Sequence, residues 1–253
     1  MGLPDTIRHL TKANVNGNIW KMSPEKVDVG WIDPGYSNGN FTHSLATAVK
    51  DMEYFGCAGR LFRHSSAIPL RSRNMVVEEF LQDSDSPWLW LIDDDMVFDK
   101  GHVMKLWSTA FDKDVKMVSG LAFIFKHSGK PVPSFFLPGS EVDGFNDGDL
   151  VNMPGWVPDG PIPVAATGLA SSLIHRDVFE DMPHERQEGY RWFDFDRTSP
   201  TGELLGEDMQ FFVRAKELGY QLWLEPDATT WHVKEIGVGL DDWKRAWGKD
   251  EEE

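Results

Sequence analysis

Cysteine is almost absent from this chain of 253 residues, in which Cys57 stands alone. A single cysteine cannot form an internal disulfide, and it excludes zinc clusters built on several cysteines. Such a composition is typical of a protein in a reducing compartment, so a cytoplasmic location is expected.

Long apolar runs are missing as well. No stretch approaches the roughly 18 or more apolar residues that a membrane-spanning helix needs. Residues 1–18 are polar and lack the apolar core of a signal peptide. We therefore expect neither a membrane span nor a secretory leader.

Basic residues are scarce relative to acidic ones. The chain has 25 Lys and Arg against 41 Asp and Glu, a formal net charge of −16. Because phosphate contacts need clustered Lys and Arg, this balance disfavours a broad nucleic-acid surface. The sequence still allows a local basic strip, since Arg60, Arg63, Arg71 and Arg73 lie close together in it.

Several well-known motifs are missing or incomplete. The chain has no Walker A motif and no G-x-G-x-x-G, which disfavours a P-loop kinase and a Rossmann dehydrogenase. Residues 35–39 match the nucleophile elbow G-x-S-x-G, but Asp33 and Pro34 separate them from the preceding strand. The segment 143–154 lacks the ligands of a calcium loop, and His184-Glu185 lacks the second histidine of a zincin.

Strand and helix signals alternate along the chain. The predicted strands cover 27–32, 58–63, 88–92, 117–125 and 221–225. The predicted helices cover 42–55, 73–81, 102–111 and 208–218. Regular structure of unspecified type is also expected over 164–175. Strands that alternate with helices imply an α/β fold with a mainly parallel central sheet flanked by helices.

The chain is interpreted as a single catalytic domain with an extension at its N-terminus and a tail at its C-terminus. The domain covers 27–240, with a first half at 27–125 and a second half at 164–240. Between them, 126–163 holds seven of the fifteen prolines and six of the 23 glycines, which predicts a long loop that acts as a lid or binding segment. An N-terminal extension, 1–26, and an acidic tail, 241–253, complete the chain.

The aspartate triplet Asp93-Asp94-Asp95 directly follows the apolar run that begins at Trp88. An α/β sheet presents its ligand site at the carboxyl ends of its strands, and adjacent carboxylates repel one another unless a cation or hydrogen-bond donors compensate them. Divalent cations that also bind phosphate are held by one or two carboxylates. The triplet therefore indicates a metal–diphosphate site, although an ordinary polar turn is the alternative.

Two further positions are candidates for chemistry. Glu207 and Asp208 begin a helix, where acidic side chains either complement the helix dipole or, facing an acceptor hydroxyl, act as a general base. His232 follows the last strand, and it is either a structural histidine or a metal ligand that suits Mn²⁺ together with carboxylates.

Taken in order, these pieces resemble the GT-A glycosyltransferases, in particular the family-2-like enzymes that use nucleotide-diphosphate sugars. Arg73-Asn74 followed by 88–95 is similar to the family's "RN … L-D-D-D" pattern, and 166–179 resembles its strand with a glycine beside the donor sugar. Gly206-Glu207-Asp208 is similar to the acceptor-side E-D motif, and Trp231-His232 to the place of a metal-binding histidine.

The resemblance implies a role for each matching residue. Asp93 would contact the nucleotide with Asp94 beside it, Asp95 and His232 would hold Mn²⁺ or Mg²⁺ with Asp93 as a further ligand, and Asp208, with Glu207 second, would be the base. Arg73 would organise Asp93 or a phosphate, and Gly168 would lie beside the donor sugar. The nucleoside would lie in a loop made of Asp33, Pro34, Gly35, Tyr36, Ser37 and Asn38, and Trp156 is a candidate platform for the acceptor.

The expected partners are a nucleotide-diphosphate sugar, with a UDP-sugar favoured, and a hydroxyl acceptor. A protein, a glycan or a small glycoside is favoured over nucleic acid as acceptor because the chain is acidic. A nucleotidyltransferase is the nearest alternative, but its phosphate loop is usually basic, whereas 35–40 contains neither Lys nor Arg. A catalytically inert sugar- or nucleotide-binding module is the other alternative.

Overall fold

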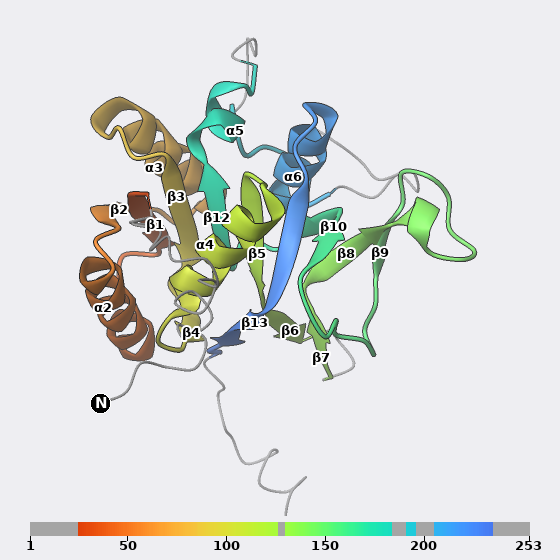
Figure 1. Ribbon diagram of the computed structural model, residues 1–253, viewed down its shortest axis with the longest axis horizontal. Helices are drawn as coiled ribbons and strands as arrows, with labels where there is room; N and C mark the ends of the chain where they lie inside the picture. The colour runs from red at the N-terminus through yellow and green to blue at the C-terminus, as the bar shows by residue number, and fades with distance from the viewer. Residues whose placement is uncertain (1–24, 126–129, 184–190, 196–204, 235–253) are drawn as a thin grey trace, which may run out of the picture.

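The strands and helices predicted from the sequence build a central sheet with helices on both faces (Figure 1). The computed structural model describes residues 25–125, 130–183, 191–195 and 205–234. The acidic tail and most of the N-terminal extension, which were set apart in the sequence, lie outside these residues.

The main sheet has eight strands in the order β10-β13-β5-β12-β3-β1-β2, with β4 paired to β13. The strands are β1 (Val27–Asp33), β2 (Ala58–Ser65), β3 (Trp88–Asp93), β4 (Met96–Phe98), β5 (Met117–Leu121), β10 (Ile162–Val164), β12 (Ser171–His175) and β13 (Leu222–His232). β1 runs parallel to β2 and β3, and β13 runs parallel to β5, while β12 is antiparallel to both β3 and β5.

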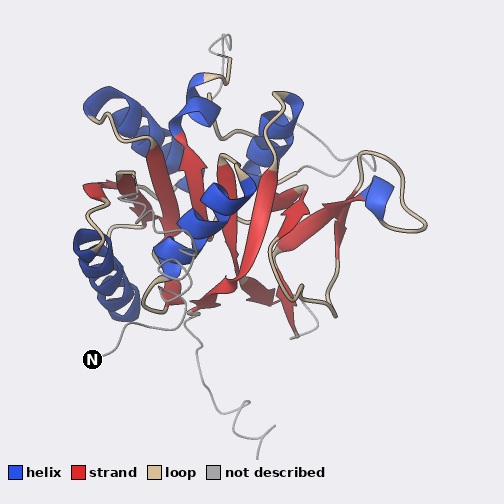
Figure 2. Cartoon of the chain, viewed as in Figure 1, coloured by secondary structure: helices blue, strands red, loops and turns tan. Residues whose placement is uncertain are grey.

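Helices pack on both faces of this sheet, as the layers in Figure 2 show. They are α2 (Gly39–Tyr54), α3 (Pro69–Asp83), α4 (His102–Lys113), α5 (Arg176–Glu180) and α6 (Glu207–Glu217). Residues 88–92 of β3 are all buried, and alternate side chains enter two different apolar clusters: Leu89 and Leu91 join the cluster of α3 and α6, whereas Trp90 joins that of α2 and α4. A strand covered on both faces is apolar throughout, which explains the apolar run in the sequence.

The α/β prediction is therefore confirmed, but several element bounds differ. The helix predicted from residue 73 begins at Pro69, whose fixed φ suits the first helical position, so Arg73 lies in the second turn and not at the helix start. The last strand continues past residue 225 to His232 and thus carries the histidine itself. The segment 164–175 is divided among short strands, including β11 (Ala166–Thr167) and β12.

The proline- and glycine-rich segment was predicted to be a long loop, and the structure corrects this. It contains β7 (Pro131–Pro133), β8 (Phe135–Pro138), the 3₁₀ helix η1 (Gly139–Glu141) and β9 (Leu150–Asn152), besides β10. β7 pairs with β6 (Phe123–Phe125), and β8 lies between β9 and β11 in a three-stranded sheet. Proline is tolerated at strand ends and edges, and buried Phe135 and Val151 anchor the segment, so its composition hid short strands.

Among the described residues, none of the helices has both the length and the apolar character that crossing a membrane would require.

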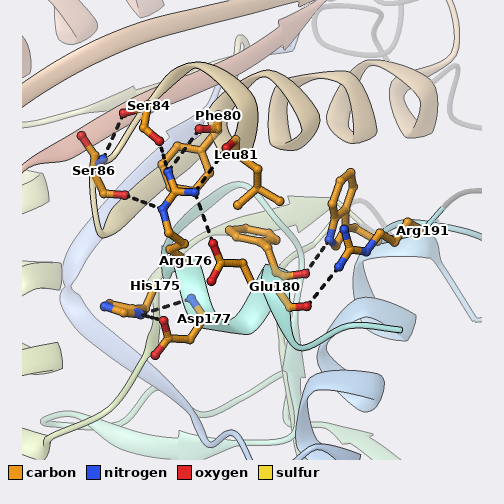
Figure 3. A network of polar contacts seen from close by, with 11 residues as sticks. Phe80, Leu81, Ser84, Ser86, His175, Arg176, Asp177, Glu180 and Arg191 are labelled. Carbon is orange, nitrogen blue, oxygen red and sulfur yellow. Dashed lines mark hydrogen bonds and ion pairs between the residues drawn. The ribbon is translucent and has the colours of Figure 1, made fainter. Parts of the chain in front are cut away.

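Arg176 links the end of α3 to the start of α5 (Figure 3). Its guanidinium donates hydrogen bonds to the carbonyl oxygens of Ser86 at 3.1 Å, Phe80 at 3.2 Å and Ser84, and it lies 4.4 Å from the centroid of the Phe80 ring. The last carbonyls of a helix lack full partners within the helix, and Arg176 supplies a donor to the carbonyl of Ser84, the C-cap of α3, and a second donor to that of Phe80, which also accepts from the Ser84 N–H.

We expect Arg176→Ala to lower the free energy of unfolding by about 2–4 kcal/mol, because the carbonyl groups of Ser84 and Ser86 lose a donor together and the packing of the guanidinium on the Phe80 ring is lost. Urea unfolding at neutral pH measures the change. Arg71→Ala, which removes an exposed arginine of α3, is the control and should shift stability by no more than about 0.5 kcal/mol. Equal stability of the two variants would contradict the role given to Arg176.

His102 is a buried histidine of α4 whose burial lowers its pKa to about 3. Its Nε2 lies 2.7 Å from Ser171 Oγ, and its ring packs near those of Trp90 and Phe98. Between the ordinary histidine pKa of about 6.5 and this lowered value, the unfolded chain binds a proton that the folded chain does not. Stability that His102 contributes in its neutral form is therefore lost as the pH falls through this window.

We expect His102→Gln, which keeps a hydrogen-bonding group, to make the unfolding free energy less sensitive to acid. Between pH 7 and pH 4.5 the parent should lose about 2–3 kcal/mol more than the variant. Urea titrations at a series of pH values give both curves. Parallel curves would show that His102 does not titrate in this way.

Candidate functional site

Three strands end side by side at the edge of the sheet where the aspartate triplet lies. Asp33 ends β1, Ser65 ends β2 and Asp93 ends β3, and the pairing register places Ser65 opposite Asp33 and Asp93 opposite Ile32. This edge is the carboxyl end of the parallel strands, where α/β sheets bind their ligands.

Asp33 is the most strongly hydrogen-bonded carboxylate of this edge. Arg63 Nε lies 2.5 Å from its Oδ2, while Oδ1 accepts from Ser65 Oγ at 2.7 Å and from the Gly35 backbone N–H at 2.8 Å. These donors, Arg63 above all, lower the pKa of Asp33 to about 2 although burial opposes them. Asp33 is thus an anion at neutral pH and fixes the start of the loop that follows β1.

The rest of that loop is more open. Tyr36 is 67% exposed, and the side chain of Asn38 accepts a hydrogen bond from the Asn40 N–H, so it caps α2. Gly35 has a φ of +112°, a conformation that other residues rarely adopt, which lets the chain turn directly after Pro34. Ser37 lies between these positions, and the predicted contact of this loop with a nucleoside remains a prediction.

Arg73 connects the aspartate triplet to the start of α6. Its Nη2 donates to both oxygens of Asp93, at 2.9 and 3.1 Å, and its Nη1 donates to Glu207 Oε1. Burial alone would lower the pKa of this guanidinium, but Asp93 and Glu207 outweigh burial and raise it. Arg73 therefore lies beside Asp93 as expected. It also donates a hydrogen bond to Glu207, a contact that the sequence did not predict.

Asp95 and His232, far apart in the sequence, meet at the end of β13. His232 Nε2 lies 2.7 Å from Asp95 Oδ2, and its Nδ1 lies 3.2 Å from the carbonyl oxygen of Phe123. Because a carbonyl can only accept, Nδ1 donates to Phe123, while Nε2 faces the carboxylate of Asp95 as its donor; a cation bound between the two side chains would take the place of the Nε2 proton. This orientation of a histidine by a carbonyl behind it is the usual one in metal sites.

Lys234 contacts the same carboxylate, with Nζ 3.0 Å from Asp95 Oδ2. Burial of Asp95 opposes its ionisation, but the hydrogen bonds from His232 and Lys234 outweigh burial and lower its pKa. Asp94, between the two anchored aspartates, has its pKa raised to about 6 by burial and by the charges of Asp95, Asp33 and Asp93. Negative charge is therefore concentrated at this edge beyond what the local cations neutralise.

The predicted set of three metal ligands is not assembled by side chains alone. Within the described part of the chain, no group of three or more His, Cys, Asp or Glu residues is placed to hold a metal ion. Asp93 has both oxygens bound by Arg73, whereas Asp95 and His232 face each other. One carboxylate and one imidazole fit Mn²⁺ or Mg²⁺ only if substrate oxygens and water complete the coordination, as is common for cations that bind phosphate.

A second group of predicted residues meets at the start of α6. Asp208 Oδ1 accepts from the Met209 N–H at 2.7 Å, and a Cβ added to Gly168 would lie 3.5 Å from Asp208 Oδ2 and 2.9 Å from Ser134 Oγ. Gly168 therefore leaves space next to the Asp208 carboxyl that a larger residue would fill. Burial raises the pKa of Asp208, Arg73 opposes that rise, and Glu207 reinforces it.

Trp156, the predicted acceptor platform, is 42% exposed and meets the Phe135 ring edge-on, with centroids 5.8 Å apart. It is thus a partly exposed aromatic side chain on a rigid support. Its part in binding an acceptor remains a prediction.

Sequence reasoning missed several neighbours of these residues. Lys234 and Ser134 were not singled out, and Arg63 was noted only as part of a basic strip. The partner of Asp33 could have been found, because Arg63 ends the strand that was expected to follow β1. The contacts of Lys234 and Ser134 depend on the long course of β13 and on β8, which the sequence did not predict.

Comparison with solved structures identifies proteins of similar fold. No model of a known protein family matches the sequence, and neither does any curated protein. The structure is similar to that of A197 from STIV, with a TM-score of 0.52, 15% identity, and 85% of this chain and 97% of that one covered. It is also similar to GalNAc-T7, crystallised with UDP, GalNAc and Mn²⁺, with a TM-score of 0.53 and 10% identity.

The second match covers 84% of this chain but only 44% of the GalNAc-T7 chain, so the protein spans less than half the length of that relative. At these identities the likeness concerns the fold. The protein has a GT-A-like fold: a mixed α/β structure with a central, mostly parallel sheet flanked by helices.

Proposed function

We propose that the protein is a metal-dependent glycosyltransferase that moves a sugar from a nucleotide-diphosphate donor, with a UDP-sugar favoured, to a hydroxyl acceptor. The observation that supports it best is the meeting of Asp95 and His232 at the carboxyl edge of a GT-A-like sheet. A chance polar turn after β3 would not require a histidine from β13, oriented by a backbone carbonyl, to face the last aspartate of the triplet.

The donor side of the proposed site is the edge formed by β1, β2 and β3. Asp33, fixed by Arg63 and Ser65, offers a permanent anion to the hydroxyl or N–H donors of a nucleoside. Asp93, oriented by Arg73, is the second acceptor for the nucleotide, and Asp94 lies between Asp93 and the metal ligand. Gly168 leaves room for the sugar beside Asp208.

Asp95 and His232 would hold Mn²⁺ or Mg²⁺, with the diphosphate completing its coordination. The cation would neutralise the negative charge that develops as the nucleoside diphosphate departs. Lys234, already in contact with Asp95, adds a second positive group next to the same position.

The acceptor side is the start of α6, where Asp208 is proposed as the general base. Glu207 is less suited to this role because its carboxylate is bound by Arg73. The raised pKa of the Asp208 carboxyl makes its carboxylate a stronger base than an exposed one, which favours removal of the proton from an acceptor hydroxyl.

Release of UDP from a panel of UDP-sugars tests the proposal, with Mn²⁺ or with EDTA, and with and without simple glycosides as acceptors. Metal-dependent UDP release from one sugar donor is the expected result. Pyrophosphate release from a nucleoside triphosphate would instead indicate the nucleotidyltransferase. Nucleotide binding with no turnover of any donor would favour the inert binding module.

A further inference from the structure

A cavity of about 350 Å³ lies at the end of the sheet opposite to the candidate site. It is bordered by the start of β3, the end of β12 and the residues between α4 and β5. β3 has Trp88 at the cavity and Asp93 at the candidate site, and its six residues span about 17 Å. The two places therefore share no residue, and the cavity can be occupied independently.

Aromatic rings form two sides of this cavity. Trp107 and Phe111 of α4 stack with ring centroids 5.5 Å apart and planes 9° from parallel, and Phe111 is 53% exposed. Trp88 meets the ring of His175 edge-on at 4.8 Å, where the register of β3 and β12 pairs the two residues. Such a wall offers flat apolar surface to a ligand, with Phe111 the most accessible ring.

Polar groups of both kinds line the remaining wall. Glu25 Oε2 accepts from Trp88 Nε1–H at 2.8 Å, and no described residue donates to Oε1. His175 Nδ1 accepts from the Asp177 N–H at 3.3 Å, so in the neutral ring the proton is on Nε2. Figure 3 shows His175 and Asp177 at the start of α5, below the Arg176 side chain. Acceptors and a neutral donor thus border the same space.

The charges of the lining argue against an anionic ligand. Glu25 and Asp114 are acidic and would repel an anion, and the lysine of the lining, Lys116, is itself paired with Asp177. A neutral ligand with one flat apolar face and several hydroxyl groups matches rings on one side and hydrogen-bonding groups on the other. We propose that this cavity binds a neutral mono- or disaccharide, apart from the donor site.

Saturation-transfer NMR on the full-length protein tests this, with glucose, galactose, N-acetylglucosamine and maltose as probes and without nucleotide or metal. At least one sugar should receive saturation, and Phe111→Ala should weaken its binding at least about threefold through loss of the exposed ring. Phe145→Ala is the matched control, because Phe145 is similarly exposed, at 51%, and lies outside the cavity. It should leave the affinity unchanged.

Two further measurements distinguish sugar binding in this cavity from sugar binding at the donor site and from the binding of an ion. Gly168→Ala, which fills the space proposed for the donor sugar, should bind the sugar as the parent does, and loss of binding in that variant would place the sugar at the donor site and overturn the proposal. Inorganic phosphate and tetramethylammonium serve as anionic and cationic probes. The proposal would also be overturned if one of these ions bound and none of the sugars did, or if no sugar received saturation. Equal affinity of the sugar for Phe111→Ala and for the parent would overturn it as well.

Discussion

Asp95→Asn is expected to abolish the metal-dependent binding of UDP, with a loss of affinity of about 100-fold or more. The substitution keeps the size of the side chain but removes the charge that, with His232 Nε2, would hold the cation. Changes to groups that merely support a metal ligand already cost about 10- to 100-fold, so loss of the ligand itself should exceed that range. Isothermal titration with UDP in Mn²⁺ and in EDTA measures the effect.

The control for this variant is Asp99→Asn, which removes an exposed carboxylate a few residues further along the chain. It should bind UDP with Mn²⁺ as the parent does. If Asp95→Asn instead retains the parent's affinity in Mn²⁺, the assignment of the metal to Asp95 is wrong. A far-ultraviolet circular dichroism spectrum identical to that of the parent shows that the variant is folded.

Asp208→Asn is expected to leave donor binding unchanged while lowering the rate of sugar transfer by about 10²-fold or more, the usual contribution of a general base. The amide has nearly the same shape and can still accept from the Met209 N–H, but it cannot take a proton from the acceptor. Transfer rates are measured at saturating donor, and donor affinity is measured separately, so that the two effects are distinguished.

Glu217→Gln is the matched control, because this exposed carboxylate lies at the other end of the same helix. Transfer by that variant should equal that of the parent. A transfer rate in Asp208→Asn close to the parental one would remove Asp208 from the mechanism. Binding of donor without transfer by the parent itself would instead support the inert module.

Local patterns were sufficient to predict most strands of the main sheet, although β4 and β10 were missed. The apolar run of β3 and the helical spacing of α2 and α4 are properties of neighbouring residues, and each of these elements appears within a few residues of its expected bounds. The proline-rich segment was mistaken for a loop because its strands, such as β7 and β8, have only three or four residues and contain proline. Composition alone does not reveal strands this short.

The candidate site was predicted in part for a similar reason. Residues at the ends of parallel strands meet at one edge, so the closeness of Asp33 to the aspartate triplet follows from the strand pattern. The contact of Arg73 with Glu207 does not follow, because it joins the second turn of α3 to the start of α6, which is far away in the sequence. Likewise, Lys234 reaches Asp95 only because β13 pairs with β4 directly after the triplet.

The most direct test of the central claim is the thermal stability of the protein with UDP, GDP, CDP and ADP, each in Mn²⁺ and in EDTA. A ligand present at about a hundred times its dissociation constant stabilises the fold by about 2.7 kcal/mol, which is a measurable shift. The proposed site predicts stabilisation by one nucleotide, UDP first, that is lost in EDTA. No stabilisation by any of the four would contradict a metal–diphosphate site at Asp95 and His232, and would leave the triplet as a structural turn.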